Sequence, residues 1–218
     1  MAVDRRALVK LFGGPRMAVP SCQVLPPGLP GYEPYCPYTL DLAAARRLVA
    51  DSGTAGQTVT LVTDDSPVAR AVGTYLLDVL RDLGFVPRLR SLSGNVQFTY
   101  IQNTGNQVQI SLTNWYGDYP SASNYLGGVF GCTAFRPNSD ASPNIAGWCD
   151  PAMDAALATA LADPAGAPQV AALDRALTDQ APAAVLFNPR YIDFVSARVG
   201  GYAYHNQFRW LIGQAWVR

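Results

Sequence analysis

The segment with the clearest chemical potential is NWYGDYPSASNYL, residues 114–126, which follows a run of alternating apolar and polar residues. It places one carboxylate, Asp118, among the aromatic side chains of Trp115, Tyr116 and Tyr119. Tryptophan and tyrosine offer stiff apolar faces with polar edges, and a buried carboxylate is costly unless a cation pairs with it. The segment therefore predicts either a site for a cationic group or a solvated turn in which the aspartate caps backbone amides.

The remainder of the sequence contains no catalytic constellation. The motifs G-x-S-x-G, H-E-x-x-H, G-x-G-x-x-G and the P-loop are all missing from it. The single histidine, His205, lies in an aromatic tail, where a packed or surface role is expected. Asp64 and Asp65 precede a predicted helix, where capping explains them. We expect no enzyme activity, no cofactor and no metal site.

Composition limits the class of protein. The chain has 218 residues, of which 49% are hydrophobic and 15% charged, and its formal net charge is zero. This composition is typical of a globular protein with one large domain, or one domain with an appendage. The sequence shows no cluster of basic residues that could bind the phosphate backbone of a nucleic acid, so nucleic-acid binding is not expected. The sequence contains no run of eighteen apolar residues, so no membrane-spanning helix is predicted.

The four cysteines are either free buried thiols or two disulfides. They are Cys22, Cys36, Cys132 and Cys149, and none belongs to a C-x-x-C pair. Three connectivities are open; local pairing would close two short, turn-rich loops, each worth roughly 3 kcal/mol. Disulfides would imply an oxidising compartment. The N-terminal MAVDRRALVKLFGG is not a signal peptide, so we expect a mature or truncated piece of a longer protein.

Local patterns predict the elements that must position the aromatic segment. Helical spacing is found at residues 7–12, 42–51 and 66–83, the last two capped by Asp41 and by Ser66 with Pro67. Alternation predicts strands at 56–64, 85–92 and 107–114. This order favours an α/β layer with a mostly parallel sheet, and ligand crevices lie beyond the carboxyl ends of such strands.

The second half of the chain is predicted to be mainly helical. Residues 150–162 and 167–180 form alanine-rich helices, the first capped by Asp150, with a core-facing stripe of Met153, Leu157 and Leu161. Proline- and glycine-rich loops cover residues 15–38 and 132–149. Strands are predicted at 183–189 and 191–199, before an aromatic tail.

The aromatic segment resembles the W-x-x-D-Y-P-x-x-x-N-(aromatic)-L signature of the family 5 extracellular solute-binding proteins, the peptide- and nickel-type receptors of ABC importers. Other segments resemble the same family in the same order, and together they cover nearly the whole chain: VDRRALVKLFGG, VLPPGLPGY, YTLDLAAARRLVADSG, VTLVT, and the series from CDPAMDAAL to LDRALTDQAPAAVLFNP.

The resemblance covers only the second half of that family. It implies an α/β fold, the C-terminal lobe of a type II periplasmic-binding-protein-like fold, with a mixed sheet flanked by helices. Residues 1–188 would form this lobe, and residues 189–218 a crossing segment and tail that return to an absent N-terminal lobe. The export signal would lie in that missing half, and the protein would be extracytoplasmic, at the cell surface or in the periplasm.

The resemblance also implies roles for the site residues. Asp118 would accept the free α-ammonium of a peptide-like solute, and Trp115 would form a wall beside it. Tyr116 and Tyr119 would stack or hydrogen-bond, and we expect one of them to pack inward. An ABC permease would be the partner of the full-length protein. The family also includes receptors for nickel chelates and sugars, so the solute stays open, and a sensing module attached to a regulatory protein is the alternative function.

Overall fold

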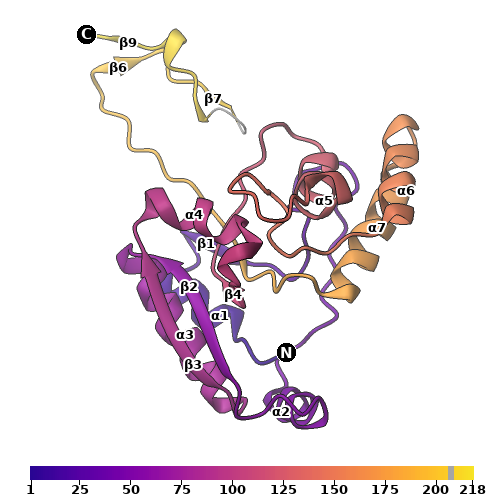
Figure 1. The fold of residues 1–218 in the computed structure, drawn as a ribbon. Helices are drawn as coiled ribbons and strands as arrows, with labels where there is room; N and C mark the ends of the chain where they lie inside the picture. The colour runs from indigo at the N-terminus through magenta and orange to yellow at the C-terminus, as the bar shows by residue number, and fades with distance from the viewer. Residues whose placement is uncertain (206–208) are drawn as a thin grey trace.

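A three-stranded parallel sheet organises the first half of the chain (Figure 1). The computed structural model describes residues 1–205 and 209–218. The strand order is β3-β2-β4, with β2 (Thr58–Asp64) in the centre, β3 (Val86–Leu92) on one side and β4 (Ile110–Ser111) on the other. Parallel strands require a crossover, and α3 (Pro67–Asp82) provides it between β2 and β3 while packing on the sheet.

The helices around this sheet begin at the caps that the sequence predicts. Asp41 starts α2 (Leu42–Asp51), and its Oδ1 accepts a hydrogen bond from the backbone N–H of Ala44 at 2.8 Å. Ser66 starts α3, and its Oγ accepts one from the N–H of Ala69 at 3.2 Å. Each cap satisfies a backbone donor that would otherwise lack a helical partner.

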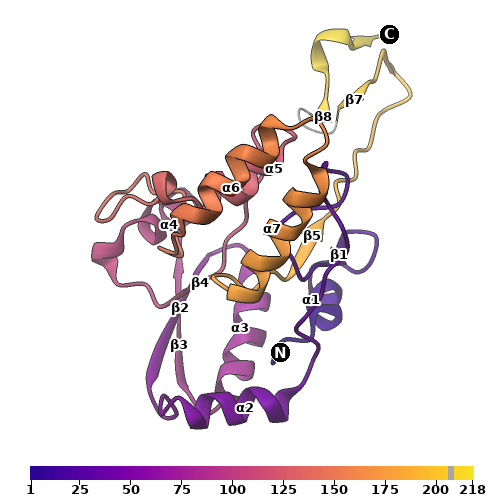
Figure 2. The same ribbon diagram turned by 90° about the vertical axis from the view of Figure 1, so that its right-hand side faces the viewer.

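The main hydrophobic core lies in the second half, among α5 (Ala122–Phe130), α6 (Pro151–Ala162) and α7 (Ala167–Gln180) (Figure 2). Its buried members come from these helices and from the proline-rich loop: Leu25, Ala122, Leu126, Phe130, Leu157, Ala160, Val170 and Leu177. The predicted stripe on α6 is only partly correct. Leu157 is buried and Met153 packs against the core, but Leu161 is 42% exposed, while its neighbour Ala160 is the buried residue of the last turn.

The N-terminal segment and the end of the lobe lie side by side. After α1 (Arg5–Leu11), the strand β1 (Ala18–Pro20) pairs antiparallel with β5 (Phe187–Pro189). The fold thus combines a parallel sheet, antiparallel pairs and flanking helices, which confirms the predicted mixed α/β class. No helix in the described ranges 1–205 and 209–218 is long and apolar enough to cross a membrane.

A buried carboxylate fixes the proline-rich loop onto α7. Asp174 is 1% exposed, and it accepts hydrogen bonds from the side-chain amide of Gln23 at 2.7 Å and from the backbone N–H groups of Val24 and Leu25 at 3.2 Å. Burial raises the pKa of the Asp174 carboxyl, and the three hydrogen bonds oppose that shift. The loop therefore has a polar attachment in addition to its apolar contacts.

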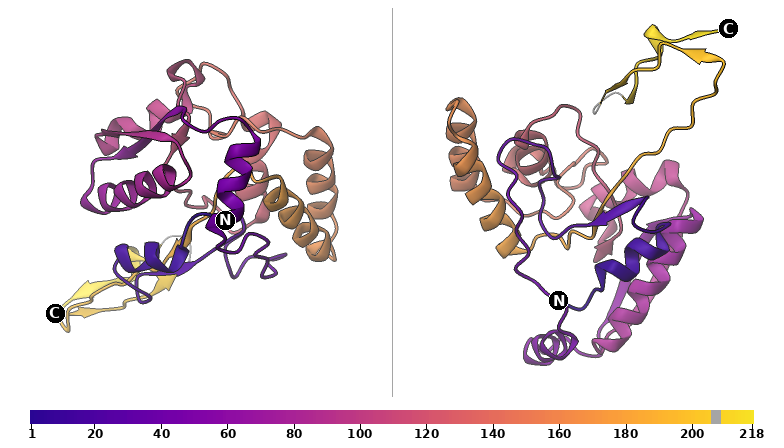
Figure 3. Two further views of the ribbon diagram at one scale, coloured as in Figure 1. Left: turned by 90° about the horizontal axis from the view of Figure 1, so that it is seen from below. Right: turned by 180° about the vertical axis from the view of Figure 1, so that it is seen from behind.

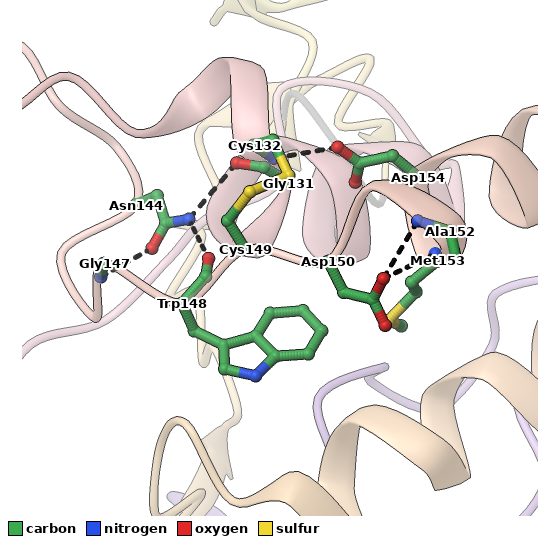
Figure 4. The surroundings of a disulfide bond; sticks show 10 residues. All are labelled: Gly131, Cys132, Asn144, Gly147, Trp148, Cys149, Asp150, Ala152, Met153 and Asp154. Atoms are coloured by element: carbon green, nitrogen blue, oxygen red, sulfur yellow. Dashed lines mark hydrogen bonds between the residues drawn. A yellow bond between two sulfur atoms is a disulfide. The ribbon is translucent and has the colours of Figure 1, made fainter.

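Both cysteine-bearing loops are closed by disulfides, Cys22–Cys36 and Cys132–Cys149, so the local connectivity is the one found. The second disulfide joins η2 (Cys132–Ala134) to the residue before the N-cap of α6 (Figure 4). Beside it, the buried Asn144 donates to the carbonyls of Gly131 at 3.2 Å and Trp148 at 2.7 Å. Covalent and polar contacts together shape a loop that has little regular structure.

The structure corrects several predicted elements. The alternating run 107–114 forms only the short β4, because η1 (Thr104–Asn106) precedes it and Gln107 has a positive φ of 49°. Two helices were not predicted, α4 (Gly94–Gln102) and α5. Residues 191–198 form no strand, since no neighbouring strand pairs with them among the described residues.

Most of the tail, including its C-terminal end, extends away from the two halves (Figure 3). Its elements are short antiparallel pairs, β6 (Val199–Gly200) with β9 (Trp216–Val217) and β7 (Tyr204–His205) with β8 (Arg209–Trp210), together with η3 (Ile212–Gln214). Many of its large apolar side chains are exposed, and Phe194 reaches 95%. The tail does not contribute to the hydrophobic core described above.

Replacing the buried carboxylate should measure the attachment of the loop to α7. Asp174→Ala leaves three donors without their partner, so we expect a loss of about 3 kcal/mol in the free energy of unfolding, measured by urea denaturation. Asp78→Ala removes an exposed ion pair with Arg81 and should cost about 0.5 kcal/mol or less. Equal effects of the two variants would contradict the assigned role of Asp174.

Thiol titration and the free energy of unfolding should both report on the two disulfides. Unfolded, non-reduced protein should contain no titratable thiol. The double variant Cys132→Ser with Cys149→Ser should lose about 3 kcal/mol of unfolding free energy, the value for a loop of this length. Four reactive thiols in the non-reduced protein would show that the bonds do not form.

Candidate ligand-binding site

The aromatic segment lies at the carboxyl end of the parallel sheet. The ladder between β4 and β2 continues to Leu112, whose N–H donates to the carbonyl of Val62 at 2.9 Å. The chain then has no regular structure until Ser121, the N-cap of α5. Residues 114–121 therefore lie beyond the end of a parallel strand, as predicted from the sequence.

The side chain of Asn124, in the first turn of α5, contacts two of the predicted site residues. Its Oδ1 accepts a hydrogen bond from the indole Nε1–H of Trp115 at 2.7 Å and another from the backbone N–H of Asp118 at 3.2 Å. Its Nδ2 donates to Oδ2 of Asp118 at 3.4 Å. Trp115 and Asp118, three positions apart in the sequence, are thus held by one amide.

Position 117 requires a glycine because the Tyr125 side chain lies close to its Cα, not because the backbone has a positive φ there. Its φ is not among the positive values, but a Cβ at this position would lie 2.6 Å from the phenol oxygen of Tyr125. The N–H of Gly117 donates to the same oxygen at 3.2 Å. Burial raises the pKa of Tyr125, and the charge of Asp118 adds to this shift, while the hydrogen bond from Gly117 opposes it.

The carboxylate of Asp118 is exposed to solvent. In the part of the chain that the structure describes, no backbone N–H donates to it, and the Asn124 amide is its hydrogen-bonding partner. Such a carboxylate remains available to a cation. The alternative prediction, a turn in which Asp118 caps backbone amides, does not describe this arrangement.

The two tyrosines of the segment correct one expectation. Neither packs inward: Tyr116 is 55% exposed and Tyr119 is 48% exposed. The residue with the more protected ring is Trp115, because its indole bonds to the buried Asn124. The hydroxyl of Tyr119 accepts a hydrogen bond from Oγ of Ser123 at 3.2 Å, which holds this ring near α5.

Two residues of the tail lie against the segment and were not predicted. The ring of Tyr191 lies 6.0 Å from that of Tyr116, and the guanidinium of Arg209 lies 3.5 Å from the Tyr191 ring centroid and 6.0 Å from that of Tyr116. Burial and the contact with Tyr116 raise the pKa of Tyr191 to about 12, although Arg209 opposes the shift. No local pattern indicates these contacts, since both residues lie far from Tyr116 in the sequence.

A small cavity of about 180 Å³ lies behind the segment. Its lining includes Pro120, Ser121 and Ala122, together with residues of the α6–α7 connection. Asp118 and the two tyrosines are not part of this lining. Among the described residues, no group of three or more histidine, cysteine or carboxylate side chains could hold a metal ion.

Changing Gly117 should test the close approach to Tyr125. We expect Gly117→Ala to lower the free energy of unfolding by about 1–3 kcal/mol, because the new methyl group displaces the Tyr125 ring. Combined with Tyr125→Phe, the loss should be smaller than the sum of the single losses, since the nearest atom is gone. Gly128→Ala is the matched control on α5; its Cβ has room and should stabilise by up to about 1 kcal/mol. Additive losses in the unfolding experiments would contradict the proposed clash.

Solved structures share this fold over the entire chain. The dipeptide binding protein from Pseudoalteromonas sp. SM9913, in complex with Met-Leu, matches 100% of this chain and 43% of its own, with a TM-score of 0.80 and 20% identity. The murein tripeptide binding protein MppA of Escherichia coli matches 99% and 43%, with a TM-score of 0.79 and 22% identity. The periplasmic binding protein DppA of Helicobacter pylori, described as ABC transporter-associated and in complex with the peptide STSA, matches 99% and 42%, with a TM-score of 0.83 and 16% identity.

The chain therefore spans less than half the length of these proteins. They are binding proteins, not enzymes. No curated protein sequence matches the chain. The sequence profile of bacterial extracellular solute-binding proteins, family 5 (middle region), matches residues 1–137, well over half of the chain. Together with the fold, this match shows that the chain belongs to the family 5 bacterial extracellular solute-binding proteins.

Proposed function

We propose that this chain is the C-terminal lobe of a receptor that binds a peptide-like or other amine-bearing solute for an ABC importer. The observation that carries the proposal is the carboxylate of Asp118. It is exposed at the end of the parallel sheet, and among the described residues its hydrogen-bonding partner is the Asn124 amide. Trp115 forms the wall beside it, and the exposed rings of Tyr116 and Tyr119 extend that surface.

The chemistry of this surface suits an ammonium group. A carboxylate and an ammonium form a charge-assisted hydrogen bond, which is roughly twice as strong as a neutral one. When a second lobe closes over the site, the carboxylate loses water, and this cost is offset only by a cation. Enclosure therefore selects for solutes that carry an amine and rejects neutral analogues.

The structural relatives support a peptide-like solute. The proteins from Pseudoalteromonas, E. coli and H. pylori are described as binding a dipeptide, a murein tripeptide and the peptide STSA. Their sequence identity to this chain is between 16% and 22%, so they support the class of solute through the shared fold and leave its identity open. The H. pylori protein also supports the proposed partnership with an ABC permease.

The other half of the receptor is proposed to be an N-terminal lobe, to which residues 189–218 return. Exposed apolar side chains along this segment support the proposal, because water contact with so much apolar surface is unfavourable. They include Ile192, Phe194, Ile212 and Val217, all more than 60% exposed. Two disulfides and membership of an extracellular family support an extracytoplasmic location.

The test is calorimetric titration of a protein that carries both lobes. A panel of dipeptides beginning with Met-Leu, and the same peptides with an acetylated N-terminus, serve as probes. Asp118→Asn should weaken binding of the free amines by about 1.5–3 kcal/mol, the range for hydrogen bonds to charged groups. The acetylated peptides should bind weakly to both forms. The 218-residue chain alone should bind the free amines more weakly than the two-lobed protein, because it lacks the opposing wall.

Asp51→Asn is the matched control, since Asp51 is also exposed but is the last residue of α2, outside the candidate site. It should leave the affinity unchanged. Equal affinity of wild type and Asp118→Asn for the free amines, or equal binding of acetylated and free peptides, would contradict the proposed role of Asp118.

A further inference from the structure

We infer that Asn124 is the positioning residue of the candidate site: its buried amide sets the geometry of both Trp115 and Asp118 and leaves the negative charge of Asp118 intact. The inference rests on the proposed function for the meaning of the site, but its structural content is independent of any ligand. It follows from the burial of Asn124, from the direction of its hydrogen bonds and from the place of α5 in the core.

Asn124 is 3% exposed, on a helix whose neighbouring turns belong to the hydrophobic core. A buried amide must find hydrogen-bonding partners, because it has lost its hydrogen bonds to water and an unsatisfied polar group in such surroundings is costly. All three hydrogen bonds of the Asn124 side chain go to Trp115 and Asp118. The residue therefore joins the rigid core to the irregular segment, and to nothing else among the described residues.

The chemistry of its partners fixes which way the amide faces. The Trp115 indole and the Asp118 backbone both present N–H groups, which can only donate. They require the oxygen of Asn124, and a flipped amide would direct its NH₂ group at two donors. The Nδ2 group must consequently face the Asp118 carboxylate, as observed. A single side chain thus recognises three groups of the segment through one allowed orientation.

A neutral donor suits this position better than a cation. An arginine or lysine in contact with Asp118 would neutralise the charge that attracts an amine. The amide of Asn124 instead restrains Oδ2 through a long contact of 3.4 Å and adds no charge. An ionised carboxylate has about four lone-pair sites, so most of its capacity stays available to an ammonium, which brings three donors.

The anchoring of α5 makes the restraint effective. Ala122, Leu126 and Phe130 of this helix are buried against α6 and α7, so the first turn that carries Asn124 has little freedom. Groups held by packed helices are placed more accurately than groups on free loops. Tyr125, the next residue, contacts Gly117 in the same way, so the segment is attached to α5 at two adjacent positions.

The experiment uses the 218-residue chain without ligand. The indole N–H signal of Trp115 is assigned in nitrogen–proton NMR spectra with the variant Trp115→Phe, and its hydrogen exchange is compared with that of Trp148 in the same sample. Asn124→Leu should speed exchange at Trp115 at least about tenfold relative to Trp148, because the buried acceptor is lost. Asn144→Leu is the matched control. It removes an equally buried amide, bonded to Gly131, Gly147 and Trp148, and should not speed exchange at Trp115.

An exchange of the two side chains separates positioning from general stability. Asn124→Asp keeps the acceptor for Trp115 but sets two carboxylates against each other, so its urea midpoint should fall. Adding Asp118→Asn places an amide donor at position 118 opposite the carboxylate acceptor at position 124. The urea midpoint should then rise most of the way back to the wild-type value, and the indole N–H signal of Trp115 should return to its wild-type position. This rescue does not depend on filling space in the core, because the four variants of the cycle have nearly the same volume.

Two results would overturn the inference: unchanged relative exchange at Trp115 in Asn124→Leu, or a combined variant no more stable than Asn124→Asp alone. In the two-lobed protein, the combined variant should still lose at least about tenfold in affinity for Met-Leu, since the exposed negative charge has moved into the core. Retained affinity would contradict the proposed binding role of Asp118 and would not bear on the positioning role of Asn124. A failure of the proposed function alone would instead leave the ligand-free results intact.

Discussion

The candidate site depends on one constraint, the need of a buried amide for hydrogen-bonding partners. Asn124 satisfies this need with an indole, a backbone N–H and a carboxylate, all within a segment that has no regular structure of its own. The core that packs α5 against α6 and α7 therefore determines where the Asp118 charge lies. A polar network of this kind specifies geometry because any other arrangement would leave a buried polar group without a hydrogen-bonding partner, which is costly.

The same principle recurs in the loops that frame the lobe. Asp174 attaches the proline-rich loop to α7, and Asn144 organises the loop closed by Cys132 and Cys149. Each buried polar side chain bonds mainly to backbone groups of an irregular segment, where no helix or strand can satisfy them. Disulfides add a covalent limit on both loops. The lobe is thus a small apolar core with long connections that polar and covalent contacts hold in place.

Sequence patterns predict the parts of this fold whose causes are local. The helices α2, α3 and α6 begin at caps that the sequence shows, Asp41, Ser66 and Asp150, and the alternating residues of β2 and β3 predict these two strands. The helix α5 was not predicted because Gly127 and Gly128 lower its intrinsic helix propensity, while its stability comes from packing on α6. Trp115 and Asp118 were found from their types and spacing. Tyr191 and Arg209 were not, because only the folded chain brings them to Tyr116.

The contact of Tyr116 with Tyr191 links the binding surface to the tail. Arg209 lies over both rings, so three side chains from distant parts of the chain form one stack at the outer rim of the site. A second lobe that docks on the tail would therefore also lie near the side chains in contact with the Tyr116 ring. Under the proposed function, capture of a solute and docking of the tail would share these three side chains.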